Sequence, residues 1–221
     1  MNAAAAAEAG ARDGLSAWIA PGRTALVIID MQVDFAAPDG QLGQWGVDLS
    51  SVPAALAKAE ALAASARRSG VPVVFVTLVT RKETDSAAWR ERMRRRGGDA
   101  DSDSGLCRAG TRGAECYGPL PLPGEPVVEK ARYSGFHQAD LDWVLKGLKV
   151  DTLVMAGLTT ECCVDCTARD AFHLDYHVFV ARDACAAYEP DIHEGALKSL
   201  ELNCAILVET DQVVAAWEEA A

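Results

Sequence analysis

Three side chains that can act together in hydrolysis stand directly after short apolar runs of the chain. Asp30 ends the run TALVIID, Lys130 follows EPVVE, and Cys163 comes shortly after TLVMA, in the segment GLTTECC. A thiol attacks carbonyl carbons, a carboxylate accepts and returns protons, and an ammonium stabilises a nearby thiolate. If the fold brings these residues together, they have the chemistry of a cysteine hydrolase that forms a covalent intermediate.

The position of Cys163 suggests how its thiol would be activated. It is expected in the first turn of a helix, where the peptide dipoles favour a thiolate, and Lys130 would favour it further. Asp30 would accept the thiol proton and return it to the leaving group. Free backbone N–H groups at the start of the helix would hold the oxyanion.

Each of these residues also has a purely structural interpretation, which stays open at this point. An Asp after a strand is often a cap or a turn former, and a single Lys is most often a solvated charge. The clustered thiols on the predicted helix could be small buried apolar groups. These thiols belong to Cys162, Cys163 and Cys166.

Cys163 and Cys166 also form a C-x-x-C pair, which is compatible with half a zinc site or a redox pair. Cys107 and Cys116 are not at a spacing that would complete a zinc site, and the four His form neither H-x-H nor H-E-x-x-H. We therefore expect no metal and no cofactor.

The elements that would position these residues can be predicted from the alternation of apolar runs with helical periodicity. Strands alternating with helices imply parallel βαβ units, so we expect an α/β fold: a doubly wound three-layer sandwich with a six-stranded parallel sheet. Ligands of such sheets bind beyond the carboxyl ends of the strands. The predicted strands are Thr24–Asp30, Val71–Val79, Glu125–Glu129, Thr152–Ala156, His177–Ala181 and Ala205–Val208, and the predicted helices are Val52–Ser69, Gln138–Gly147, Glu161–Leu174 and Glu189–Leu202.

We expect a single domain over residues 21–221, preceded by a flexible or accessory arm over residues 1–20. Residues 80–124 interrupt the alternation and contain five Arg between Arg90 and Arg96. Long irregular insertions are often lids or binding loops. A solvated charged helix followed by a surface loop is an equally good interpretation.

Composition excludes several classes of protein. The 221 residues are 50% hydrophobic and carry 21 basic against 32 acidic side chains, a net charge of −11. An acidic chain is a poor nucleic-acid binder, and no apolar run approaches the roughly 20 residues of a membrane span. The N-terminus lacks the pattern of a secretory signal. Seven Cys without such a signal indicate reduced thiols and a cytoplasmic protein.

Three segments resemble the isochorismatase-like cysteine hydrolases. They are ALVIIDMQVDF (Ala25–Phe35), EKARYSGF (Glu129–Phe136) and GLTTECCVDCTARDA (Gly157–Ala171), and the resemblance spans about Thr24 to Val208.

The resemblance implies a role for each residue of the expected site. Asp30 would be the acid/base and Lys130 its charge partner. Cys163 would be the nucleophile, because it is the thiol that directly precedes the Val of the motif. A cis peptide bond would join Leu158 to Thr159 and turn the N–H of Thr159 towards the oxyanion.

Departures from the pattern narrow the expected chemistry. The nicotinamidase branch has a metal site with Asp-x-His and a further His, but no His precedes His137 here. Enzymes that cleave isochorismate act on a vinyl ether without a thiol, so Cys163 favours carbon–nitrogen chemistry. RYSGF and CVDCTARDAFHLDYHV resemble the ureidoacrylate-hydrolysing branch most. Biuret or N-carbamoyl-amino-acid hydrolysis, vinyl ether hydrolysis and a catalytically silent binding protein remain alternatives.

Residues that follow the expected triad members should line a small pocket with aromatic walls. We expect the enzyme to be a homo-oligomer, a dimer or a tetramer, with a small amide or ureido compound as its partner. The carboxylate of a ureido acid would need a cation, either in the cluster Arg90–Arg96 or at Arg132. The expected lining residues are Gln32, Phe35, Tyr133 and Phe136.

Overall fold

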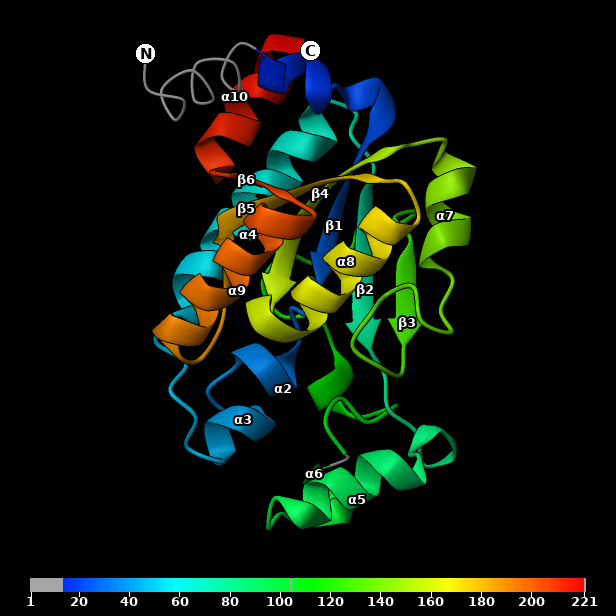
Figure 1. Cartoon of the computed structure of the whole chain (residues 1–221), viewed down its shortest axis with the longest axis vertical. Helices are drawn as coiled ribbons and strands as arrows, with labels where there is room; N and C mark the ends of the chain where they lie inside the picture. Colours follow the sequence, from blue (N-terminus) through cyan, green and yellow to red (C-terminus); the bar gives the residue numbers. More distant parts are fainter. Residues whose placement is uncertain (1–13, 104, 221) are drawn as a thin grey trace.

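The structure is a computed structural model that describes residues 14–103 and 105–220. It contains a six-stranded sheet in the order β3-β2-β1-β4-β5-β6, and every pairing is parallel (Figure 1). The predicted α/β fold with a six-stranded parallel sheet is confirmed. The strands are β1 (Thr24–Ile29), β2 (Val73–Leu78), β3 (Val127–Lys130), β4 (Thr152–Leu158), β5 (His177–Ala186) and β6 (Ile206–Val208).

The position of each strand in the sheet follows from its sequence. β1, β2 and β4 are continuous apolar runs in which every residue is buried, as expected for strands covered on both faces. β3 has the sequence VVEK and alternates exposed with buried residues, which suits a strand at the sheet edge. Lys130 is the last buried residue of that edge strand, so its side chain reaches over the sheet instead of into solvent.

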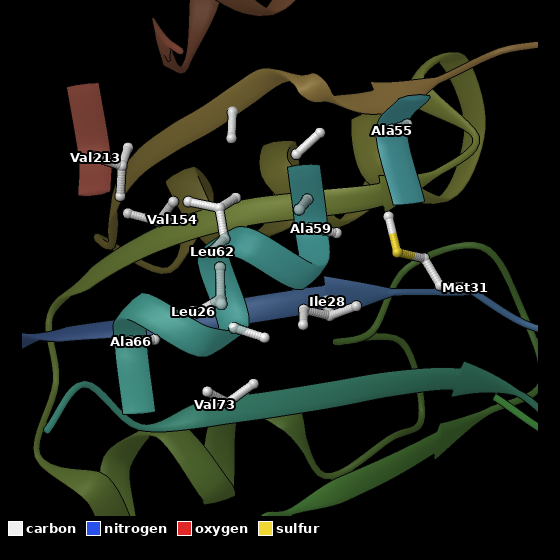
Figure 2. Packing of buried hydrophobic residues seen from close by; sticks show 14 of the residues in the cluster. Leu26, Ile28, Met31, Ala55, Ala59, Leu62, Ala66, Val73, Val154 and Val213 are labelled. Carbon is white, nitrogen blue, oxygen red and sulfur yellow. The ribbon is translucent and has the colours of Figure 1, made fainter. Parts of the chain in front are cut away.

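Helices cover both faces of the sheet. One face packs against α4 (Val52–Arg68) and α10 (Thr210–Ala220), through the apolar cluster drawn in Figure 2. The other face packs against α7 (Leu141–Leu148), α8 (Asp165–His173) and α9 (Pro190–Asn203).

The N-terminal part of the described chain packs against the C-terminal helix. Leu15 and Ile19 are buried, and the indole N–H of Trp217 donates a 2.9 Å hydrogen bond to the carbonyl of Ile19. Residues 14–20 therefore pack as part of the domain, although we expected them in an arm. Residues 1–13 of that arm lie outside the described residues.

Short helices occupy the loops at the carboxyl ends of the strands. In Figure 1, α5 and α6 lie beyond the arrowheads of β2 and β3. No helix in the described part of the chain is both long and apolar enough to cross a bilayer. The remaining short elements are η1 (Pro21–Arg23), α2 (Val33–Ala36), α3 (Gln41–Gln44), η2 (Lys82–Thr84), α5 (Ala87–Arg95), α6 (Ala100–Asp103), η3 (Arg112–Ala114) and the π-turn η4 (Thr160–Val164).

Candidate active site

The sheet brings the three predicted catalytic side chains together. Lys130 Nζ lies 2.6 Å from Asp30 Oδ2 and 3.4 Å from Cys163 Sγ. Asp30 follows β1 and Cys163 follows β4, and these neighbouring strands lead to opposite halves of the sheet. Ligands of open α/β sheets bind at such a switch point. Lys130 reaches it from the end of β3, across β2.

All three side chains are removed from solvent. The relative exposures of Asp30, Lys130 and Cys163 are 0%, 2% and 6%. Asp30 also has a φ of 49°, in the left-handed region that non-glycine residues seldom adopt outside turns and functional sites. Lys130 Nζ donates a further 3.0 Å hydrogen bond to the carbonyl of Arg132, which fixes the direction of the ammonium.

Burial dominates the electrostatics of the Asp30–Lys130 pair. It raises the pKa of Asp30 above the ordinary value, while the charge of Lys130 acts in the opposite direction. Burial alone would lower the pKa of Lys130, but the charges and hydrogen bonds of Asp30 and Cys163 outweigh it and raise that pKa. Oδ1 of Asp30 is buried without a hydrogen-bond partner among the described residues, so it is free to receive a proton.

The pKa of Cys163 differs from our expectation. We expected the helix start and Lys130 to favour a thiolate, but the pKa of this thiol lies well above its ordinary value. A hydrogen bond with the Cys162 side chain, burial and the negative charge of Asp30 raise it, and together they outweigh the effect of Lys130. The resting nucleophile is therefore a neutral thiol beside a carboxylate, which makes proton transfer to Asp30 part of its activation.

The backbone that carries Cys163 follows a tight path. The peptide bond between Leu158 and Thr159 is cis, at the position that the resemblance implied. Cys163 then lies in the π-turn Thr160–Val164, so α8 begins four residues later than we expected. Gly157 precedes this turn with a φ of 149°, and a Cβ there would lie 2.2 Å from the carbonyl oxygen of Ile29. Only glycine lets β4 approach β1 this closely.

Two side chains hold the π-turn from outside. The hydroxyl of Thr159 donates a 2.7 Å hydrogen bond to Glu161 Oε1. Thr160 Oγ1 lies 2.8 Å from Nδ1 of His193, which belongs to α9. Burial lowers the pKa of His193, so the ring is a neutral partner of the Thr160 hydroxyl near neutral pH.

Gln32, an expected lining residue, forms hydrogen bonds with backbone groups around the site. Its amide nitrogen donates 2.8 Å hydrogen bonds to the carbonyls of Leu78 and Ala114, and its amide oxygen accepts one from the N–H of Leu78. Because both hydrogens of its NH2 group are used, Gln32 joins β2 to the insertion. That it also lines the pocket stays a prediction.

The three expected aromatic residues differ in position. Tyr133 is half-buried and packs against the buried cluster that includes Cys163. Phe35 is partly buried, and its carbonyl accepts a 3.0 Å hydrogen bond from the hydroxyl of Tyr188. Phe136 instead packs against Tyr176, with ring centroids 6.0 Å apart. Tyr133 and Phe35 therefore remain candidate wall residues, whereas the ring contact of Phe136 serves the core.

Two residues at the site were missed by the sequence analysis. The hydroxyl of Thr167 donates a 2.6 Å hydrogen bond to the carbonyl of Cys163 and accepts one of 3.1 Å from the N–H of Gly135. Its spacing of four from Cys163 was a usable signal, because Thr in helices often bonds the carbonyl four residues back. Tyr188 follows β5, and its hydroxyl donates a hydrogen bond to the carbonyl of Phe35, a candidate wall residue.

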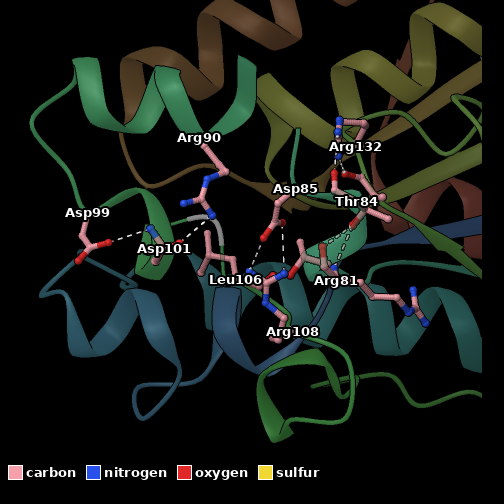
Figure 3. A network of polar contacts seen from close by, with 11 residues as sticks. Arg81, Thr84, Asp85, Arg90, Asp99, Asp101, Leu106, Arg108 and Arg132 are labelled. Atoms are coloured by element: carbon pink, nitrogen blue, oxygen red, sulfur yellow. Dashed lines mark hydrogen bonds and ion pairs between the residues drawn. The ribbon is translucent and has the colours of Figure 1, made fainter. Parts of the chain in front are cut away.

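The insertion carries the basic cluster, and most of its Arg have protein partners. Arg90 pairs with Asp101 at 2.7 Å. Arg94 and Arg95 both pair with Glu91 at 2.7 Å. Figure 3 shows this region together with the hydrogen bonds that anchor it, including the pair between Arg108 and Asp85 and the bond from Arg132 to the carbonyl of Thr84.

Within residues 14–103 and 105–220, the structure shows no group of three or more His, Cys, Asp or Glu side chains that could hold a metal ion. All seven Cys are free thiols. That activity needs no metal stays a prediction.

The family of the chain is shown by comparison with known proteins. The model of the isochorismatase domain matches residues 24–212, so the chain belongs to this family of hydrolases. Among curated relatives, the ureidoacrylate amidohydrolase RutB of Pseudomonas savastanoi pv. phaseolicola (strain 1448A / Race 6) is 34% identical over 194 residues, which cover 82% of this chain and 78% of the relative. The enzyme of the same name from Methylobacterium radiotolerans is 32% identical, with coverages of 82% and 74%.

Solved structures agree with this assignment. A cysteine hydrolase from Pseudomonas syringae pv. phaseolicola 1448A superposes with a TM-score of 0.80 at 27% identity, covering 92% of this chain and 96% of that one. N-carbamoylsarcosine amidase from Thermoplasma acidophilum has a TM-score of 0.68 at 28% identity, with coverages of 86% and 97%.

Proposed function

We propose that the protein hydrolyses the carbon–nitrogen bond of a small linear ureido compound through a thioester on Cys163, with an ureidoacrylate-type acid as the favoured substrate. The coarser assignment, a hydrolase of carbon–nitrogen bonds other than peptide bonds, follows from the family and from the amidohydrolase names of its relatives. The thioester mechanism rests on one observation: Lys130 Nζ contacts both Asp30 Oδ2 and Cys163 Sγ in a buried site. The ureidoacrylate-type substrate is favoured by the names of the curated relatives.

Proton transfer begins the proposed reaction. Asp30 takes the proton of the Cys163 thiol, and the thiolate attacks the carbonyl carbon of the substrate. Backbone N–H groups of Thr159 and Cys163 hold the oxyanion that forms. The negative charge moves from Asp30 to Cys163 in this step. Lys130 contacts both side chains, so its ammonium stabilises the charge before and after the transfer without changing position.

The same proton then leaves with the product. Asp30 returns it to the leaving nitrogen, the carbon–nitrogen bond breaks, and an acyl or carbamoyl thioester remains on Cys163. Asp30 next takes a proton from water, whose oxygen attacks the thioester carbon. As the carbon–sulfur bond breaks, Asp30 returns this proton to the departing sulfur, which regenerates the free thiol. Burial suits this cycle, because a carboxylate with a raised pKa is both a competent base and a competent acid near neutral pH.

A substrate panel tests the assignment. Ammonia release is measured with ureidoacrylate, biuret and several N-carbamoyl amino acids, and Cys163→Ala serves as the background. We expect the highest kcat/KM with the linear ureido acid and no turnover by the variant. Activity should survive a strong chelator. Turnover that persists in Cys163→Ala, or activity restored only by zinc, would contradict the proposal. The expected homo-oligomer stays a prediction, measured by light scattering.

A further inference from the structure

Helix α5 of the insertion packs directly on a candidate wall of the active site. The rings of Trp89 and Tyr133 contact each other with centroids 5.3 Å apart. The guanidinium of Arg132 lies 5.6 Å from the centroid of the Trp89 ring and donates a 2.8 Å hydrogen bond to the carbonyl of Thr84. These contacts fix α5 against the segment that follows Lys130, so its side chains have defined positions relative to the site.

Tyr133 connects α5 with the region of the nucleophile. Its ring contacts Trp89 of α5, and its side chain packs against the buried cluster that includes Cys163. Burial raises the pKa of the Tyr133 phenol, and the positive charge of Arg92, also from α5, acts in the opposite direction.

Arg92 and Arg96 are the two members of the basic cluster that pair with no carboxylate among residues 14–103 and 105–220. Among the residues that the structure describes, the guanidinium of Arg92 meets no carboxylate and only donates a 3.7 Å hydrogen bond to the sulfur of Met93. Arg90 pairs with Asp101, and Arg94 and Arg95 both pair with Glu91. Arg96 is the C-cap residue of α5, at the end of the helix away from Trp89.

Helical spacing places Arg92 on the correct side of α5. Residues three apart on a helix share a face, and Trp89 and Arg92 are three apart. Since Trp89 contacts Tyr133, Arg92 lies on the face of α5 that packs against the segment after Lys130, about one turn further along. Arg132 is nearer in sequence to Lys130, but its guanidinium is occupied by two backbone carbonyls and the Trp89 ring.

We propose that Arg92 binds the carboxylate of an anionic ureido acid at the mouth of the active site, while the ureido group lies against Cys163. The inference rests on the proposed function and specifies how that substrate is recognised. A guanidinium binds a carboxylate through two parallel hydrogen bonds, which fixes direction as well as charge. Arg92 is exposed in the structure and lacks a competing carboxylate, so binding a ligand would break no ion pair.

Steady-state kinetics with a matched pair of substrates tests the proposal. The pair consists of 3-ureidopropionate and the uncharged 3-ureidopropanol, and the proteins are the wild type, Arg92→Gln and Arg94→Gln. The last variant removes an identical charge from the same helix. We expect Arg92→Gln to raise KM for the acid about tenfold with kcat preserved, because binding is lost equally from ground and transition states. KM for the alcohol, and both values in Arg94→Gln, should stay within about twofold.

A second measurement is independent of turnover. The rate of Cys163 alkylation is followed by mass spectrometry with N-iodoacetyl-β-alanine and with N-iodoacetyl-3-aminopropanol, which share a reactive head and differ in charge. Cys163→Ala identifies labelling of other thiols. The wild type and Arg94→Gln should react faster with the acid, and Arg92→Gln should lose this preference.

The outcomes separate the two proposals. Equal effects of Arg92→Gln and Arg94→Gln, or equal effects of Arg92→Gln on acid and alcohol, would overturn the role of Arg92. A wild type that cleaves neither substrate but alkylates with the expected preference, lost only in Arg92→Gln, would overturn the proposed function and support the anion site.

Discussion

The floor of the active site and the insertion above it are held together in different ways. The floor is built from Asp30, Lys130 and Cys163, which come from three strands, are buried and contact one another. The insertion is stabilised mostly by short-range pairs between exposed side chains, such as those of Glu91 with Arg94 and Arg95. The sheet therefore fixes the arrangement of Asp30, Lys130 and Cys163, whereas the segment to which we propose to assign recognition of the substrate carboxylate depends on its own local contacts.

The largest effect on activity should come from replacing the thiols of the π-turn and α8, one at a time, by Ala. Cys163→Ala should lower kcat by about three orders of magnitude or more, because the nucleophile is lost. Cys162→Ala and Cys166→Ala should keep activity within about tenfold, since neither sulfur contacts Lys130. Ammonia release measures activity, and circular dichroism verifies folding. Loss of activity in Cys162→Ala with retention in Cys163→Ala would show that Cys162, and not Cys163, is the nucleophile.

The pH dependence of kcat/KM should report the raised pKa of the buried Asp30 carboxyl. The reaction needs Asp30 ionised in the free enzyme, and burial raises the pKa of this carboxyl. Activity should therefore fall on acidification with a midpoint above the ordinary Asp value of about 3.9. The rate of Cys163 alkylation should show the same acidic limb. A midpoint at or below the ordinary value would show that the pair with Lys130 outweighs burial.

A smaller effect should follow from the link between the nucleophile turn and the Lys130 segment. Thr167→Val removes both hydrogen bonds of a buried hydroxyl, and such losses cost about 1–3 kcal/mol. If part of this cost falls on the transition state, kcat should drop about tenfold while KM changes less than about twofold. Thr167→Ser, which keeps the hydroxyl, should restore kcat. Equal activity of the Val and Ser variants would show that Thr167 only fills space.

The smallest effect concerns the anchor of the insertion. Glu125 follows the insertion and binds Arg67 of α4 at 2.8 Å, which lowers the pKa of Glu125. A lowered folded pKa stabilises the fold above the unfolded value of about 4.3, and this contribution is lost as pH falls through the folded pKa. Glu125→Gln should therefore lower the free energy of unfolding by about 1 kcal/mol at neutral pH and by less below pH ~3.

Urea unfolding at both pH values measures the contribution of this anchor. Glu129→Gln is the matched control, because its pair with Arg81 is about half-exposed. The control variant should lose less stability at neutral pH. An equal loss for Glu125→Gln at both pH values would mean that packing, and not charge, accounts for it.

Most of the fold and the floor could be predicted from the sequence for a simple reason. Parallel strands buried on both faces are continuous apolar runs, and their carboxyl ends meet at one edge. Asp30 and Cys163 follow such runs and Lys130 ends the edge strand β3, so their positions in the sequence were enough to predict that they meet. The resemblance added the choice of Cys163 over Cys162.

The remaining features depend on tertiary contacts that a local pattern does not contain. β5 extends to Ala186, five residues beyond its predicted end, because pairing with β4 resumes after a register shift, and so Tyr188 was missed. The raised pKa of Cys163 depends on Cys162 and on burial, and the hydrogen bonds of the Gln32 amide depend on the end of β2 and on η3. α10 was also missed, and in the structure it packs on α4.

Gly157 has a consequence for how the substrate range of this enzyme can be changed. β4 and β1 meet there backbone to backbone, so no side chain sets the spacing between the strand that leads to Cys163 and the one that ends at Asp30. Substitutions elsewhere can reshape the walls without altering this spacing. A library of variants with altered specificity should therefore vary Phe35, Tyr133 and Arg92 and leave Gly157 unchanged. Every variant would then keep the same spacing between Asp30 and Cys163.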